Sequence, residues 1–260
     1  MTAATQGARR LAASVLPPTL TFLGACLVLE ALARFGNMPA YIVPAPSAVI
    51  ETLFDRLPRI LANSWYTAYV TVVGFAIALA VGVLLAIGIV SWRPFDRAVS
   101  PLLVVAQVIP KVAIAPILIV YLGYGIEPRI VLAFLIAFFP VVINTVLGLR
   151  SVDPNLLHLL QSLRATRTQV LLKVRLPNSL PYAVSGAKIA ITLALIGTVV
   201  GEFTTGEFGL GVLIQVTSAQ LDTPMTFAAL IALSLIGLIT YWGVGALGAL
   251  IARIQGRRAL

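Results

Sequence analysis

The feature that most limits how this sequence can fold is a series of six apolar segments, each about as long as a membrane-spanning helix. A helix needs about 20 apolar residues to cross the hydrocarbon core of a bilayer. Inside hydrocarbon every backbone N–H and C=O must find a partner within the protein, so only helices and closed β-barrels are stable there. The apolar runs are continuous and do not alternate as barrel strands do, which favours helices. The six predicted spans are residues 16–33, 67–90, 101–121, 130–149, 181–203 and 227–251.

The composition is that of a chain whose main solvent is lipid. Of its 260 residues, 60% are hydrophobic and 10% are charged, whereas about a quarter of the residues in a soluble domain are charged. We therefore expect an all-α polytopic membrane protein with about six transmembrane helices. The third span contains Pro110 and Pro116, and we expect it to be broken there, because proline removes a backbone donor and bends a helix.

The charges of the loops predict the orientation of the spans. Most of the 18 lysines and arginines fall in the loops on one side of the membrane. Loops rich in these residues face the cytoplasm. Both termini are then cytoplasmic, with residues 1–15 and 253–260 as tails, and so is the loop at 150–180. The segment 36–64 lies outside, where Ser47 can cap a short amphipathic surface helix at 48–57. Topology thus explains the net charge of +9, and no nucleic-acid partner is expected.

Several kinds of chemistry have no residues to support them. Cys26 and His158 are the only cysteine and the only histidine, so we expect no disulfide within the chain and no metal site built from these residue types. The sequence contains no G-x-x-x-x-G-K-[ST] motif, hence no P-loop for ATP, and no catalytic constellation, so we expect a chain that is not an enzyme. The stretch GEFGLG at 206–211 follows a predicted span rather than a strand, and we interpret it as a flexible exterior turn.

The loop at 150–180 carries helix signals between two spans. Asp153-Pro154 is typical of a helix start, and leucines follow at helical spacing. Thr166 with Gln169 has the form of a capping box, which predicts a second short helix. Pro177 is expected to end that helix, and Ser179 and Pro181 to open the fifth span. The apolar face of this helical hairpin needs a cover, and either anionic lipid headgroups or a cytosolic protein could supply it.

At these residues the sequence resembles a known family. The run SVDPNLLHLLQSLRATRTQVLLKVRLPNSLP resembles the cytoplasmic EAA loop of bacterial ABC importer permeases, most closely those of the nitrate/sulfonate/taurine-type branch. VSPLLVVAQVIPKVAIAPILIVYLGYG, FFPVVINTVLGLRSVDP and GEFTTGEFGLGVLI resemble the same family in order and spacing. The resemblance implies a type I importer fold in the bacterial inner membrane. Residues 63–252 would form its transmembrane domain, after a first helix and exterior segment at 16–62.

The resemblance also implies partners. A cytosolic ATPase dimer would bind ATP and Mg and dock on the loop, and a second permease subunit, identical or not, would complete the pathway. An exterior binding protein would deliver a small solute such as a sulfonate or nitrate. The residues expected in the ATPase-docking surface are Leu156, Leu159, Leu160, Leu163, Arg164, Ala165, Thr166 and Arg167.

The loop departs from the family pattern at its most diagnostic positions. His158, Leu159 and Leu160 stand where the family has Glu-Ala-Ala, and Arg164 stands where it has glycine. Glycine supplies a left-handed turn at little cost, so we expect the turn at Arg164 to be altered.

Polar side chains inside the predicted spans indicate either a solute pathway or hydrogen bonds between helices. An ionisable residue at the bilayer centre costs at least roughly 2.5–3.5 kcal/mol and therefore faces protein or water. The pathway candidates are Gln107, Lys111, Asn144, Thr145, Thr192, Thr198 and Glu202. Gly197 and Gly201 form a G-x-x-x-G motif that lets another helix, including one of a partner subunit, approach closely.

Two other functions are compatible with the same residues. A stand-alone ion-coupled transporter or channel would need no ATPase and would depend on Glu202 or Glu30. A membrane-embedded scaffold would tolerate leucine at Gln107 and Lys111.

Overall fold

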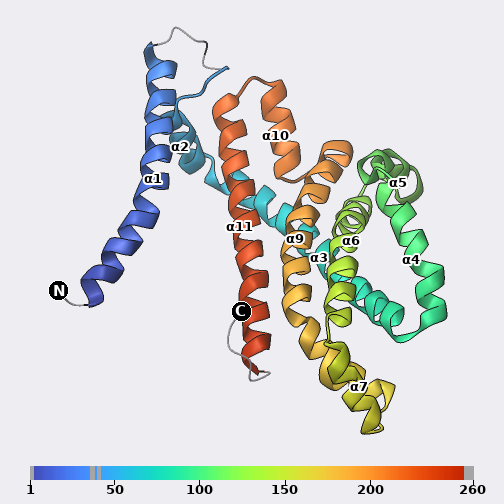
Figure 1. Ribbon diagram of the computed structural model, residues 1–260. Coiled ribbons are helices and arrows are strands. Elements are labelled where there is room, and N and C mark those ends of the chain that lie inside the picture. Colours follow the sequence, from blue (N-terminus) through green and yellow to red (C-terminus); the bar gives the residue numbers. More distant parts are fainter. Residues whose placement is uncertain (1–2, 36–38, 40–41, 255–260) are drawn as a thin grey trace. The chain divides into compact units, whose positions relative to one another are not determined.

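The structure is a computed structural model that describes residues 3–35, 39 and 42–254, apart from the side chains of residues 3–15, 18, 22 and 205. Over this range the chain is helical and contains no strand (Figure 1). The first helices are α1 (Ala3–Phe35), α2 (Pro46–Asp55), α3 (Leu57–Ser91), α4 (Arg93–Val108), η1 (Lys111–Ile114) and α5 (Ala115–Leu122). The others are α6 (Glu127–Arg150), α7 (Pro154–Ser162), α8 (Arg167–Val170), η2 (Leu171–Arg175), α9 (Leu176–Thr205), α10 (Leu210–Ala219) and α11 (Thr223–Ile254).

The chain divides into two compact units. The first comprises Met1–Leu61 and Leu213–Ile231, and the second comprises Ala62–Val212 and Ala232–Leu260.

The predicted spans correspond to the long apolar helices. Among the described residues, four helical segments are long and apolar enough to cross a membrane, and a bent pair of helices adds a fifth. The four are Leu57–Ser91, Glu127–Arg150, Arg167–Thr204 and Thr223–Ile254. The predicted first span lies within α1, part of whose side chains are outside the description. The prediction of an all-α, multi-span fold is confirmed.

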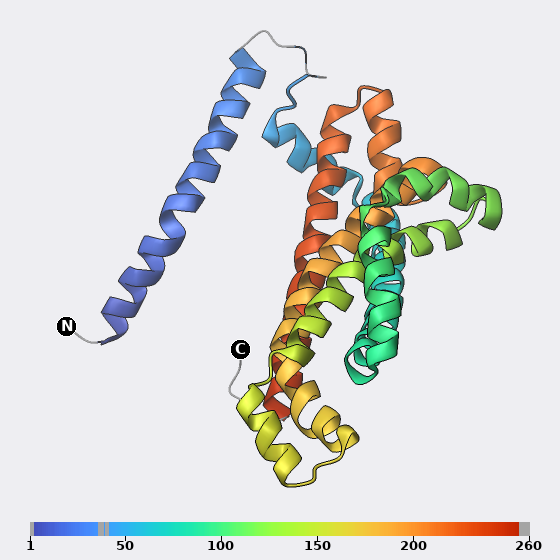
Figure 2. The same cartoon turned by 45° about the vertical axis from the view of Figure 1, so that its right-hand side comes forward.

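The third predicted span is broken, as expected, and the break is at Pro110. α4 and the segment Lys111–Leu122 meet at 82°, and they point in different directions in both views (Figures 1 and 2). Ile109 is extended, with φ −62° and ψ 126°, because the ring of a following proline disfavours helix. Pro116 makes no second break, since it lies in the first turn of α5, where a helix tolerates proline.

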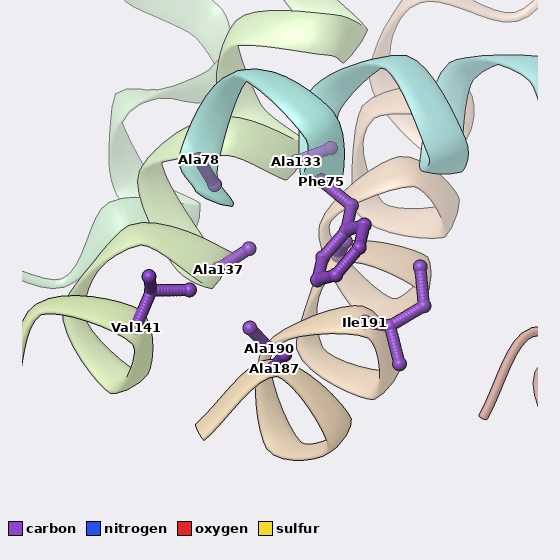
Figure 3. Packing of buried hydrophobic residues seen from close by; sticks show 9 residues of the cluster. Phe75, Ala78, Ala133, Ala137, Val141, Ala187, Ala190 and Ile191 are labelled. Carbon is purple, nitrogen blue, oxygen red and sulfur yellow. The ribbon is translucent and has the colours of Figure 1, made fainter. Parts of the chain in front are cut away.

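The core of the second unit is built from small residues on α3, α6 and α9. Ala78, Ala133 and Ala190 are among its fully buried members, and Phe75 is the largest side chain that points into it (Figure 3). Lipid supplies no hydrophobic force that drives helices together, so association in a membrane depends on close packing, which small residues permit. A Cβ at Gly197 would lie 2.9 Å from the Cα of Ala133, and one at Gly201 would lie 3.1 Å from the Cα of Arg129. The helix that approaches this G-x-x-x-G motif is therefore α6 of the same chain.

Two local predictions are wrong. Pro177 does not end the helix of the hairpin, because Arg167–Thr204 is one continuous helical segment, and Pro181 lies inside α9 instead of opening it. The residues just before Pro177 form the π-helical turn η2. That wider turn includes Lys173, whose carbonyl the proline ring would otherwise meet.

Ser47 is also not the cap of the exterior helix. The N-cap of α2 is Ala45, and Pro46 fills the first helical position. Ser47 instead bonds to α1: its hydroxyl donates to Glu30 Oε1 at 2.7 Å, and its backbone N–H donates to Glu30 Oε2 at 3.0 Å. Arg34 pairs with the same carboxylate at 2.6 Å.

The packing of α6 against α9 predicts a sharp difference between two glycines. Gly197→Ala should lower the free energy of unfolding by about 1–3 kcal/mol, because the added methyl meets a backbone that cannot move aside. Gly243→Ala, in α11, meets nothing within 4 Å and should be neutral or stabilising by up to about 1 kcal/mol. Unfolding of the purified chain in a denaturing-detergent titration measures both. Equal effects at the two positions would contradict the close approach of α6 and α9.

Candidate functional site

A buried polar cluster holds the turn that follows α9. Glu202 and Thr67 are fully buried and Arg129 is 2% exposed. The Thr67 hydroxyl donates to Glu202 Oε1 at 2.7 Å, and Glu202 Oε2 accepts the Gly211 N–H at 2.6 Å. The Leu210 N–H donates to the Thr67 hydroxyl at 2.9 Å. A carboxyl group at the end of one helix thus bonds the first residues of α10.

The rest of the turn is bonded in the same way. The Gly209 N–H donates to Asn63 Oδ1 at 2.9 Å, and Arg129 Nη1 donates to the Phe208 carbonyl at 3.0 Å. Gly209 has φ +126°, and a Cβ there would overlap the Glu202 carboxyl group. The glycines of GEFGLG are therefore required by backbone conformation and by contact with Glu202. The interpretation of this stretch as a flexible turn is wrong, since side chains of α3, α6 and α9 hold it.

The bend at Pro110 contains a second polar arrangement. Lys111 Nζ donates to the backbone carbonyl of Gln107 at 2.5 Å and lies 4.4 Å from the centroid of the Phe139 ring. In an uninterrupted helix that carbonyl would accept the backbone N–H of Lys111. The ammonium group therefore satisfies a carbonyl that the bend leaves without its usual partner.

Gln107 and Phe139 also line a cavity of about 220 Å³. The other lining residues are mostly aliphatic side chains of α4 and α6. The cavity thus combines an amide and an aromatic face in apolar surroundings, as small-molecule sites do.

The other predicted pathway residues do not gather at this cavity. Thr198 is buried against α3, with its hydroxyl 3.0 Å from that of Thr71. Asn144 donates to the Pro140 carbonyl at 2.8 Å, and exposed Thr192 donates to the Lys188 carbonyl at 2.9 Å. Thr145 is 1% exposed, and its hydroxyl has no hydrogen-bond partner among the described residues. Thr198 and Glu202 fit the alternative interpretation, hydrogen bonding within and between helices, whereas Thr145 does not.

The hairpin between α6 and α9 has the predicted caps. Asp153 accepts the Asn155 N–H at 2.8 Å, and Thr166 and Gln169 form a reciprocal capping box. Leu156 and Leu159 of α7 and its C-cap residue Leu163 are 41%, 56% and 69% exposed. Their i, i+3, i+7 spacing places them on one side of the helix. We call these three residues the leucine face.

The turn of the hairpin is not altered by its arginine, contrary to the prediction. Arg164 adopts φ 57°, the left-handed conformation that glycine would supply. Its N–H bonds the Gln161 carbonyl and the Ala165 N–H bonds the Leu160 carbonyl, both at 2.9 Å. This is a Schellman motif, and its two hydrogen bonds offset the roughly 1–2 kcal/mol that a side chain costs in this conformation.

Sequence reasoning missed three participants in the buried cluster: Thr67, Arg129 and Asn63. Thr67 is the first residue of one predicted span, and Arg129 directly precedes another. The sequence did contain a signal, because Glu202 and Arg129 both lie at ends of predicted spans. A buried carboxyl group and a buried guanidinium group usually lie next to each other.

Comparisons with known proteins agree with the geometry. The profile of the family described as "Binding-protein-dependent transport system inner membrane component" matches residues 78–258. A formylaminopyrimidine transport permease protein of Halalkalibacterium halodurans is 34% identical over 235 residues, covering 87% of this chain and 90% of its own. A riboflavin transport system permease protein of Chloroflexus aurantiacus is 35% identical over 240 residues, covering 92% of this chain and 89% of its own. A chain of the MetNI methionine ABC transporter in an inward-facing conformation shares the fold, with a TM-score of 0.59 and 21% identity over 74% of this chain and 97% of its own.

The buried cluster predicts that Glu202, but not Glu207, stabilises the turn that follows α9. Glu202→Gln replaces a carboxylate acceptor beside Arg129 and should cost about 1.5–3 kcal/mol. Hydrogen exchange at residues 206–212 should become faster. Glu207→Gln makes the same change at an exposed position in the same turn and should stay within about 0.5 kcal/mol. Indistinguishable exchange in the two variants would show that the cluster does not hold the turn.

Proposed function

The chain belongs to the family of inner membrane components of binding-protein-dependent transport systems, and from this premise we propose how it works within an ATP-driven importer. As a membrane component of such a system, it contributes helices to the pathway of a solute. The observation that carries the rest of the proposal is the leucine face on α7. Three leucines are exposed on a capped, rigid hairpin between two spans, on the side predicted to be cytoplasmic.

We assign the leucine face to the docking of a cytosolic ATPase. Exposed large apolar side chains gathered on one helix face are typical of a surface that a partner covers. Arg164, Ala165, Thr166 and Arg167 continue this surface around the turn, and half-buried Leu160 supports it. ATP and Mg would be bound and hydrolysed by that ATPase dimer. A second permease subunit would complete the pathway, an exterior binding protein would deliver the solute, and both termini would be cytoplasmic.

The ion pairs support this topology. Asp96 and Arg150 lie 2.7 Å apart and join two segments predicted to be cytoplasmic. Arg56 and Asp222, also 2.7 Å apart, join two segments predicted to be exterior.

For the solute we propose a small planar nitrogen heterocycle rather than an aliphatic sulfonate or nitrate. The names of the two relatives described above refer to formylaminopyrimidine and riboflavin, both of which contain such rings. The cavity beside the bend offers the Phe139 ring and the Gln107 amide, which can stack on a heterocycle and hydrogen-bond to it. Gln107 and Lys111 are the pathway residues that we retain.

Docking is tested by introducing acids into the leucine face. Leu159→Asp and Leu163→Asp should each reduce co-purification of the ATPase by at least roughly tenfold, because an unpaired carboxylate would be buried at the contact. Ser162→Asp adds the same charge to an exposed position of α7 outside the leucine face and should leave association intact. Unchanged assembly in both leucine variants would refute this docking role.

The solute class is tested by ATP-driven uptake into vesicles that contain the assembled importer and its binding protein. Unlabelled aminopyrimidine should compete with labelled aminopyrimidine, and ethanesulfonate at the same concentration should not. Gln107→Leu should reduce uptake by roughly tenfold, because it removes one hydrogen bond in an apolar site. Saturable uptake of the sulfonate alone would overturn the heterocycle proposal without affecting the docking role.

A further inference from the structure

A cavity on the hairpin side of the second unit has an unusual charge. It measures about 680 Å³ and is formed between the link that joins α3 to α4 and the inner side of the hairpin. Three arginines line it, Arg93, Arg167 and Arg175, and no acidic residue does. We call this space the arginine cavity.

The three arginines line one cavity although like charges repel. Arg175 is anchored, since its Nη1 donates to the Leu149 carbonyl at 3.2 Å, while its other N–H groups remain available as donors. Arg93 and Arg167 form no ion pair among the described residues and are exposed. The nearest acids in the sequence are engaged elsewhere, Asp96 with Arg150 and Ser100, and Asp153 with the first turn of α7. The cavity therefore has a positive charge that no acid of its lining neutralises.

The neutral groups of the lining are also donors. Ser91 and Thr168 present hydroxyl groups, Gln161 an amide, and Trp92 an indole N–H. The indole ring of Trp92 stacks on Phe95 at an interplanar angle of 7°, and the residue is 61% exposed. A ligand here meets three guanidinium groups, neutral donors and one flat aromatic wall.

We propose that the arginine cavity binds a phosphate ester. Guanidinium groups donate two parallel hydrogen bonds to phosphate oxygens, and clusters of arginines are the usual recognition element for phosphate. The cavity is larger than one phosphate group requires, so the ligand carries a further group that packs against Trp92. Two sources share this chemistry, a phosphorylated small molecule and the headgroup of an anionic phospholipid.

Such a ligand would connect two parts of the chain. Arg93 begins α4, the first half of the bent span, whereas Arg167 begins α8 in the hairpin. On α7 the residues that line the cavity are Leu157 and Gln161, on a different side of the helix from the leucine face. A bound phosphate ester would therefore bridge the bent span and the hairpin without covering the leucine face, although it would share Arg167 with the docking surface.

The test uses the full chain in maltoside micelles, which contain no phosphate, with phenyl phosphate and dioctanoyl phosphatidylglycerol as probes. Calorimetry and native mass spectrometry should detect saturable binding of at least one probe with a stoichiometry of one. Arg93→Gln and Arg167→Gln should each weaken it by roughly tenfold, because each removes a charge-assisted hydrogen bond. Arg167→Lys keeps the charge but loses the paired donors, and should give an intermediate loss.

Arg97→Gln is the matched control, because Arg97 is exposed on α4 and does not line the cavity. Binding of phenyl phosphate alone would identify a soluble ligand, binding of the lipid alone would identify a headgroup, and binding of both would identify a general phosphate-ester site. The proposal is overturned if neither probe binds, if both glutamine variants bind normally, or if Arg97→Gln weakens binding equally. Each substituted residue is exposed and lies outside the core. An unchanged midpoint of thermal unfolding therefore verifies that each variant is folded.

Discussion

The constraint on which this structure depends is that backbone groups in lipid must find partners inside the protein. The long helices meet it by themselves, and where the helical pattern fails polar side chains supply the missing partners. At the Pro110 bend, the Lys111 ammonium takes the place of a lost backbone donor. After α9, Glu202 and Thr67 accept the N–H groups that begin α10, and Arg129 donates to a carbonyl of the turn. The polar residues at these two places are thus first of all replacements for missing helical hydrogen bonds.

This constraint explains what could be predicted from the sequence. The spans could be identified because about 20 consecutive apolar residues leave few alternatives to a transmembrane helix. The caps at Asp153 and Thr166 were also predictable, because each is a local interaction between residues two or three apart. Glu202, Thr67 and Arg129 come together from three helices, and no local pattern reports a contact between residues so far apart in the sequence.

The wrong predictions share a physical cause, since each applied a residue preference that the surrounding structure outweighed. Proline disfavours a continuous helix, yet the π-helical turn before Pro177 widens the backbone enough to admit it. Arginine disfavours the left-handed conformation, yet Arg164 adopts it because two backbone hydrogen bonds close the turn around it. Local preferences of about 1–3 kcal/mol decide the conformation only where no larger interaction depends on that conformation.

The hairpin shows how a short segment can serve two surfaces. α7 is nine residues long, which is enough for one side to carry the exposed leucines and another to line the arginine cavity. The two sides are held in a fixed relation by the caps at each end and by the Schellman turn at Arg164. Because α8 continues without interruption through η2 into α9, a displacement of the hairpin would be transmitted directly to a membrane span. A rigid connection of this kind is what a mechanical link between a cytosolic partner and a pathway in the membrane requires.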